Sequence, residues 1–167
     1  MFIDGIFQLA LMMAAFLCSI VAGFLFAFAV VAMPGIGALK ERDFLQAFKV
    51  MDRVIQNNQP LFMLVWVASI LFLLLSAILG FNRLAGLERL ILLIATALYL
   101  LGVQLPPVII NIPLNNRLQA LDLSALDAAA LLGERLNFEA RWNRSNVFRT
   151  VMASLVSGLL MLLLFLQ

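Results

Sequence analysis

The longest stretches of this sequence carry no charged side chain. Between Asp4 and Lys40 the only ionisable group is the thiol of Cys18. An α-helix rises about 1.5 Å per residue, so roughly 20 apolar residues cross the hydrocarbon core of a bilayer. This stretch is longer than that. It predicts a membrane-spanning helix over about residues 6–33, which ends at Pro34.

Three further stretches have the same character and predict three more spans. They cover about residues 61–81, 88–105 and 146–166, and we expect Pro106-Pro107 to break the third helix. The predicted fold is therefore all-α, an integral membrane four-helix bundle that forms a single domain over residues 1–167.

The composition excludes the other classes of protein. Apolar residues make up 65% of the 167 residues and charged residues 12%, against roughly 45–50% and 25% in an ordinary soluble domain. A soluble protein of this size could not cover its surface with so few charges. The net charge of +2 is too small for a nucleic-acid partner. Without histidine and with one cysteine, zinc, haem and copper sites of the usual kinds are not expected, whereas a metal site made of carboxylates alone stays open but has no motif behind it. We predict no cofactor.

The segment between the first two spans contains an amphipathic pattern. Apolar side chains at Phe44, Phe48, Met51 and Ile55 recur at helical spacing, and charged side chains occupy the rest of the helix. This pattern predicts a short amphipathic helix within residues 35–59. Its simplest interpretation is a helix that rests on lipid headgroups.

The segment between the last two spans, residues 111–145, contains a second helix start. Ser124 is followed three residues later by Asp127, which resembles a capping box with Asp in the usual Glu position. We therefore expect a second short helix from Ala125 to Leu136.

The basic residues predict the orientation of the chain in the membrane. The two longer segments and their edges hold nine of the eleven basic residues: Lys40, Arg42, Lys49, Arg53, Arg117, Arg135, Arg141, Arg144 and Arg149. The short turn on the other side holds Arg83 and Arg89. By the positive-inside rule, the longer segments lie in the cytoplasm and both termini lie outside, as in a multi-pass protein of a bacterial inner membrane.

Polar side chains gather at one membrane side, near the ends of three predicted spans. They form three groups: Asp52, Asn57, Asn58 and Gln59; Gln104, Asn111 and Asn115; and Trp142, Asn143, Asn146 and Arg149. Polar groups near hydrocarbon are costly, so they usually face the interior of a bundle. Trp142, Asn146 and Arg149 have the spacing of a single helix face. Together these groups suit a greasy ligand with a polar tip.

Each group also has a structural interpretation. An Asn at the end of a span caps helices, Arg149 can extend its head to lipid headgroups, and Trp142, Trp66 and Tyr99 can anchor the chain at the membrane interface. The sequence leaves both interpretations open.

Three segments of the chain resemble parts of the anthrone oxygenase-like membrane proteins. The Phe-rich run from Phe24 to Pro34 is similar to the end of that family's first span. Asn111-Ile-Pro-Leu-Asn115 resembles its Asn-Val-Pro-Leu-Asn motif, and Trp142 to Thr150 resembles its pattern before the last span. Residues 51–60 are a weaker match, with Asp52 at a Gln position.

The resemblance implies a four-helix membrane bundle that oxidises anthrones with dioxygen and without a bound cofactor. Removing a proton from the anthrone gives a delocalised carbanion that reacts with dioxygen directly, so the site must supply a base and stabilise an oxyanion. Many relatives carry His where this chain has Val147, which leaves Asp52 as the nearby base.

The resulting hypothesis is a cofactor-independent oxygenase for a hydrophobic aromatic or quinone-like compound. The expected catalytic residues are Arg149, Asn115 and Asp52, and the expected substrate-binding residues are Asn111, Asn146, Trp142, Gln104 and Asn58. The alternative is a non-catalytic membrane protein that binds a lipid or quinone or acts as a partner subunit. Association with further copies of the chain stays open. Transport is disfavoured because no span carries an acidic residue at its middle.

Overall fold

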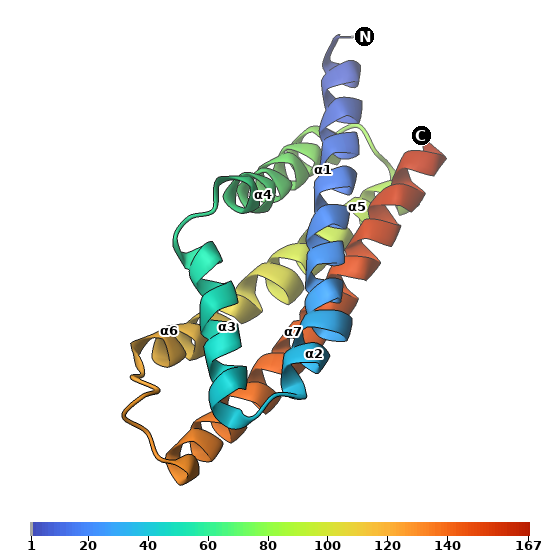
Figure 1. Ribbon diagram of the computed structural model, residues 1–167. Helices are drawn as coiled ribbons and strands as arrows, with labels where there is room; N and C mark the ends of the chain where they lie inside the picture. Colours follow the sequence, from blue (N-terminus) through green and yellow to red (C-terminus); the bar gives the residue numbers. More distant parts are fainter. Residues whose placement is uncertain (1) are drawn as a thin grey trace.

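A computed structural model describes residues 2–167, with side chains from Gly5 onward. Helices make up 89% of the structure, and the described residues contain no strand. Four helices are long and apolar enough to cross a membrane: Gly5–Gly37, Pro60–Phe81, Gly86–Ala120 and Ala128–Leu166. Both termini lie at one end of the molecule (Figure 1). The predicted all-α membrane bundle is thereby confirmed.

The first two long helices each contain a proline near one end. The first consists of α1 (Phe2–Ala27), the π-helical segment η1 (Phe28–Ala32) and α2 (Met33–Gly37), so it continues past Pro34. The second is α4 (Pro60–Phe81), whose N-cap Gln59 accepts a 2.6 Å hydrogen bond from the backbone N–H of Phe62. Proline is favourable at this first helical position because its missing N–H would have no partner there.

The third long helix does not break at Pro106-Pro107, and the expectation of a break there is wrong. It runs through α5 (Gly86–Ala97), η2 (Leu98–Gln104), η3 (Pro107–Asn111) and α6 (Ile112–Ala120). The apolar stretch and the Asn111–Asn115 motif therefore lie on one continuous helical rod.

The π-helical segments explain how the rods accommodate their prolines. Each segment ends two residues before a proline, at Ala32, Gln104 and Asn111. A proline within an α-helix clashes with the carbonyl four residues earlier and offers it no N–H. A π turn bonds five residues along, so the backbone changes register where the α-helical bond is lost. The helix therefore continues past the proline instead of ending.

The fourth long helix is α7 (Ala128–Leu166), a single helix of 39 residues. Asp127 is its N-cap and accepts a 2.8 Å hydrogen bond from the backbone N–H of Ala130. Ser124 instead lies in a turn, where it donates to Asp122. The predicted start at Ser124, and a short helix separate from the last span, are therefore wrong. At 1.5 Å per residue α7 is about 58 Å long, so its N-terminal half projects beyond a bilayer of about 30 Å.

The helix α3 (Glu41–Gln56) packs against this projecting half of α7. The rings of Phe44 and Phe48 are buried, and the Phe48 ring lies 4.6 Å from that of Phe138 on α7. The part of the apolar face formed by Phe44 and Phe48 thus packs on protein, whereas the pattern alone suggested that the face rests on lipid headgroups. A helix that finds an apolar partner in its own chain buries the same surface without the membrane.

Basic side chains fasten the two longer segments together. Arg42, Lys49 and Arg135 donate hydrogen bonds of 2.6–3.0 Å to backbone carbonyls of the opposite segment. These residues counted toward the topology prediction, yet their side chains bind loop backbone.

The molecule contains two hydrophobic clusters, one above the other along α7. The first fills the middle of the bundle between α1, α4, α5 and α7 and includes Leu11, Leu73 and Leu160. The second lies at the end opposite the termini and includes Phe44, Phe138 and Trp142. The predicted site residues other than Asn58 lie where these clusters meet.

Candidate functional site

A cavity of about 300 Å³ lies at the junction of the two clusters. Side chains from α1, α3, α4, the third long helix and α7 line it. Its polar lining consists of Asp52, Gln104, Asn111, Asn115, Trp142, Asn146 and Arg149. These are all of the site residues expected from the sequence except Asn58. The structure thus brings together residues from segments almost 100 positions apart along the chain.

Asn58 lies outside this cavity. It occupies the turn between α3 and α4, where its side chain is exposed and its φ is 56°. Asn tolerates this left-handed conformation better than most residues do. The structure therefore explains Asn58 by the turn and not by the cavity.

Asp52 lines the cavity and is held by amide groups. Its Oδ1 accepts a 2.7 Å hydrogen bond from Asn115, and its Oδ2 accepts bonds of 2.7 and 2.8 Å from Gln56 and Gln119. The side chain is buried, at 5% exposure, and forms no ion pair with any described residue. These three amide donors fix the orientation of the carboxylate and leave one lone pair, on Oδ1, free.

Asn115 connects Asp52 to Trp142. Its Nδ2 donates to Asp52, and its Oδ1 accepts a 2.9 Å hydrogen bond from the indole N–H of Trp142. Both ends of this amide are therefore committed to protein partners. The Trp142 ring also packs edge-on against Phe48, at 5.1 Å between centroids. Asn115 is thus suited to position its neighbours rather than to bind a ligand itself.

Two further amides join the helices around the cavity. Asn111 accepts a 2.7 Å hydrogen bond from Ser145 and donates a long one, 3.5 Å, to the carbonyl of Trp142. Asn146 donates a 3.2 Å bond to the carbonyl of Leu25 on α1. Buried amides of this kind need partners, and here the partners lie on other helices. They fix the relative positions of α1, η3 and α7.

Arg149 is the only basic side chain among the described residues that line the cavity, and it is 5% exposed. Its Nε donates a 3.1 Å hydrogen bond to the carbonyl of Val103. In an α-helix that carbonyl would accept from residue 107, which is proline and has no N–H. The proline therefore frees the acceptor that Arg149 uses.

The guanidinium of Arg149 also lies over the Trp66 ring, 5.5 Å from its centroid. Attraction between a cation and an aromatic face offsets part of the cost of burying the charge. No carboxylate pairs with Arg149 in the described part of the chain. The cation thus lines the cavity without an anionic partner, and an anionic group of a ligand would supply one.

Gln104 adds a hydrogen-bond donor that has no acceptor among the described residues. Its buried Nε2 makes no hydrogen bond to any described residue. A buried donor without a partner costs about 1–3 kcal/mol. Gln104 lines the cavity, but this nitrogen is itself buried, so a ligand oxygen would satisfy it only after the side chain turns into the cavity.

The aromatic wall of the cavity was not predicted from the sequence. Phe24 and Phe28 from α1 and η1, and Phe62 and Trp66 from α4, all line it. The Phe62 and Trp66 rings stack at 5.3 Å with an interplanar angle of 22°. Both pairs are spaced four residues apart, which places each pair on one helix face. That spacing was the available signal, but phenylalanine is too common in apolar helices for it to stand out.

The cavity adjoins a wider apolar recess between α1, α3 and α4. This recess has a volume of about 590 Å³ and shares Phe24, Phe28, Ile55, Phe62 and Trp66 with the cavity. Several of its other lining residues, such as Val54 and Leu61, are exposed. In a membrane this recess would face the lipid.

No group of three His, Cys, Asp or Glu side chains that could hold a metal ion occurs among the residues with described side chains. The groups available for chemistry in the cavity are one carboxylate, one guanidinium, amides and aromatic rings.

Comparison with known proteins gives one match. No curated protein and no solved structure matches the chain. The model of the anthrone oxygenase family matches residues 47–160, which include the segments that contribute α3, α4, the third long helix and most of α7 to the cavity. On this match, the chain belongs to the anthrone oxygenase family.

Proposed function

We propose that the protein is a membrane oxygenase that oxidises a hydrophobic aromatic ketone of the anthrone type with dioxygen. One observation carries the proposal: the carboxylate of Asp52 and the guanidinium of Arg149 line the same aromatic-walled cavity and form no ion pair with each other. An unpaired base and an unpaired cation in one cavity suit a reaction that removes a proton and builds negative charge on an oxygen.

The first step in this proposal is proton removal from the substrate's ring methylene. Asp52 accepts the proton, and the electron pair of the broken C–H bond spreads over the rings onto the ketone oxygen. Arg149 stabilises that oxygen, as does the free N–H of Gln104 once its side chain turns into the cavity. Preorganised donors of this kind contribute most where charge develops in the transition state.

The second step consumes dioxygen. The carbanion reduces dioxygen and forms a C–O bond to it, and the peroxide takes the proton held by Asp52. The hydroperoxide then loses water, which contains its outer oxygen, its own proton and the second hydrogen of the methylene carbon. The carbon is left as a carbonyl. The sum is one anthrone and one dioxygen giving one anthraquinone and one water.

The wider recess supports a hydrophobic substrate. Apart from Gln59, it is lined by apolar side chains and by the aromatic residues that it shares with the cavity. A planar aromatic compound dissolved in lipid would reach the cavity past Phe62 and Trp66 without crossing water. The stacked rings favour flat molecules over saturated chains.

Oxygen consumption by the purified protein in lipid nanodiscs tests the proposal. We expect anthrone-dependent oxygen uptake above that of empty nanodiscs, with anthraquinone as the product. Asp52→Asn and Arg149→Gln should each lower the rate at least about 100-fold, as removal of a catalytic base or an oxyanion donor does. The matched controls are Asp43→Asn and Arg53→Gln, both exposed on α3, and they should leave the rate unchanged.

Binding of anthraquinone, followed by quenching of tryptophan fluorescence, separates catalysis from binding. Wild-type protein that binds anthraquinone but consumes no oxygen would contradict the proposal and favour a non-catalytic binding protein. Oxygen uptake that survives Asp52→Asn would instead contradict the assigned base.

We also propose that the end carrying α3 and α6 faces the cytoplasm of a bacterial cell. Exposed Arg53, Arg117, Arg141 and Arg144 at this end support the orientation. A cysteine placed at residue 117 should react with membrane-impermeant maleimide only after the membrane is opened, whereas one placed at residue 83 should react in intact spheroplasts. The reverse pattern would contradict the orientation.

A further inference from the structure

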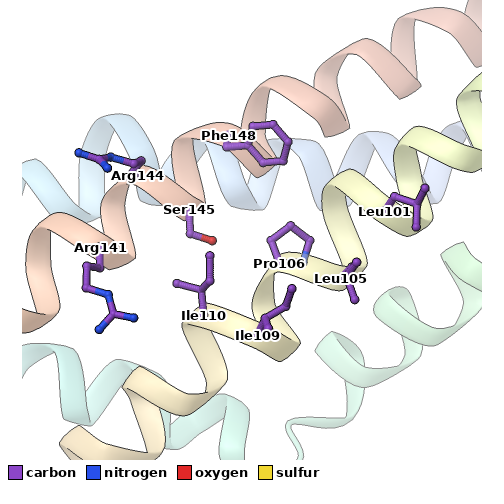
Figure 2. A pocket seen from close by; sticks show the side chains of 9 residues that line it. All are labelled: Leu101, Leu105, Pro106, Ile109, Ile110, Arg141, Arg144, Ser145 and Phe148. Atoms are coloured by element: carbon purple, nitrogen blue, oxygen red, sulfur yellow. The ribbon is translucent and has the colours of Figure 1, made fainter.

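A groove on the outer side of the bundle lies between the third long helix and α7 (Figure 2). Its volume is about 470 Å³. Apolar side chains, among them Leu101, Leu105, Ile109 and Phe148, form most of its surface. Arg141 and Arg144 lie at one end of the groove and Leu101 lies at the other (Figure 2). The groove is therefore amphipathic along its length.

The groove is separate from the cavity. Ser145 lines the groove, Asn111 lines the cavity, and the hydrogen bond of 2.7 Å between them forms part of the wall. A ligand in the groove would not occupy the position proposed for the substrate.

The two arginines of the groove have no partner among the described residues. Arg141 and Arg144 are exposed, and neither forms a hydrogen bond or an ion pair there. By contrast, the neighbouring Arg117 pairs with Glu134 at 2.8 Å, and Arg135 pairs with Glu139 at 2.7 Å. Two free guanidinium groups three residues apart on one helix can both reach a single anion.

The position of the groove matches the depth profile of a membrane. From Asn146 to the end of the chain the only charged side chain is the buried Arg149, so Arg144 lies just outside the apolar span. From Ile109 to Leu101 the third helix continues for about 12 Å toward the bundle middle. The charged end thus lies at headgroup depth and the apolar end lies within hydrocarbon.

We infer that this groove binds one anionic phospholipid, with its phosphate between Arg141 and Arg144 and an acyl chain along Leu101, Leu105 and Ile109. Basic pockets beside membrane helices recognise anionic headgroups through charge and hydrogen bonding. A zwitterionic lipid fills the apolar part equally well, but its ammonium group opposes the two arginines. The selectivity therefore comes from the charged end, and the occupancy depends on the apolar surface.

Native mass spectrometry of the delipidated protein tests this inference. The protein is mixed with equal amounts of phosphatidylglycerol and phosphatidylcholine that carry the same acyl chains. We expect the first bound lipid to be phosphatidylglycerol by about tenfold or more. The double variant Arg141→Gln/Arg144→Gln should lose this preference. The double variant Lys40→Gln/Arg53→Gln removes the same charge from exposed sites at the same end and should keep it.

A second pair of variants tests the apolar part of the groove. Ile109→Trp fills the groove without changing charge, and Phe148→Ala removes one of its walls. Each should weaken phosphatidylglycerol retention several-fold while both arginines remain, and a thermal melt checks that each variant is folded. An equal loss of preference in the Lys40/Arg53 control, or retention unaffected by both groove variants, would show diffuse attraction to the membrane and overturn the inference.

Discussion

The cavity and the groove lie on opposite sides of the contact between Asn111 and Ser145. Their arginines differ in burial and in hydrogen-bond partners. In the cavity, Arg149 is buried, bonds to the carbonyl of Val103 and lies over an indole ring. In the groove, Arg141 and Arg144 are exposed and have no partner among the described residues. All three belong to the same helix, α7.

The difference is one of helix face. Five residues separate Arg144 from Arg149, and at 100° per residue they point about 140° apart. The face of Arg149 turns into the bundle, where a charge must find partners. The face of Arg144 turns outward at headgroup depth, where the surroundings supply them. One residue type thus lines a buried cavity on one face of α7 and an exposed groove on another.

The largest expected effect comes from removing the interior charge. Arg149→Met should lower the oxygen-uptake rate about 100- to 1,000-fold because the developing oxyanion loses its cation. The midpoint of thermal unfolding should stay the same or rise, since an apolar replacement removes a buried cation that has no carboxylate partner. Activity and unfolding are measured on the same preparation. A variant that keeps its activity would end the distinction between the interior and the outer arginines.

The next largest effect concerns the amide that connects Asp52 and Trp142. Asn115→Leu leaves the indole N–H without its acceptor and removes one donor to the carboxylate, so the free energy of unfolding should fall by about 2–3 kcal/mol. Asn137→Leu, at an exposed position on α7, should change it by less than about 0.5 kcal/mol. Reversible unfolding in detergent measures both. Equal effects of the two variants would show that the buried network adds nothing to stability.

Pro107→Ala tests whether the freed carbonyl of Val103 positions Arg149. Alanine restores an N–H that competes with Arg149 for the carbonyl of Val103. We expect a drop in oxygen uptake of several-fold with an unchanged or higher unfolding midpoint. Pro113→Ala provides the control, because Pro113 lies farther along the same helix and does not line the cavity. Unchanged activity in Pro107→Ala would mean that Arg149 does not depend on this acceptor.

The smallest effect should come from the wall between the two sites. Ser145→Ala removes the hydroxyl that donates to Asn111 and should cost about 1 kcal/mol of unfolding free energy. Phosphatidylglycerol preference should stay the same, because neither arginine of the groove changes. A lost preference would show that the cavity and the groove are not independent.

Part of the candidate site could be predicted from spacing alone. Trp142, Asn146 and Arg149 share a helix face by their separations, and the structure places all three at the cavity. Asn58 stood in an equally polar segment, but a turn directs it outward. Trp66 looked like an interface anchor, and it lies instead beneath the guanidinium of Arg149. Spacing along one helix predicted which side chains share a face. It did not predict which side chains from different helices come into contact.

The positions of the prolines were evident from the sequence, but their effect on the backbone was not. The sequence identified Pro34 and Pro106-Pro107 as points where an α-helix loses its bonds. It did not reveal that π turns would carry the rods through those points. The choice between ending and continuing depends on what packs around the bond, and here neighbouring side chains such as Arg149 occupy the freed acceptor.

By itself the sequence determined that this is a membrane protein and how many long helices it has. The length and charge of an apolar run decide whether it can cross a bilayer. It also determined which polar residues were too costly to leave in hydrocarbon. Only the tertiary structure decided which of them meet. Hydrogen bonds between helices depend on the rotation of each rod about its axis, and packing against all the other rods fixes that rotation at once.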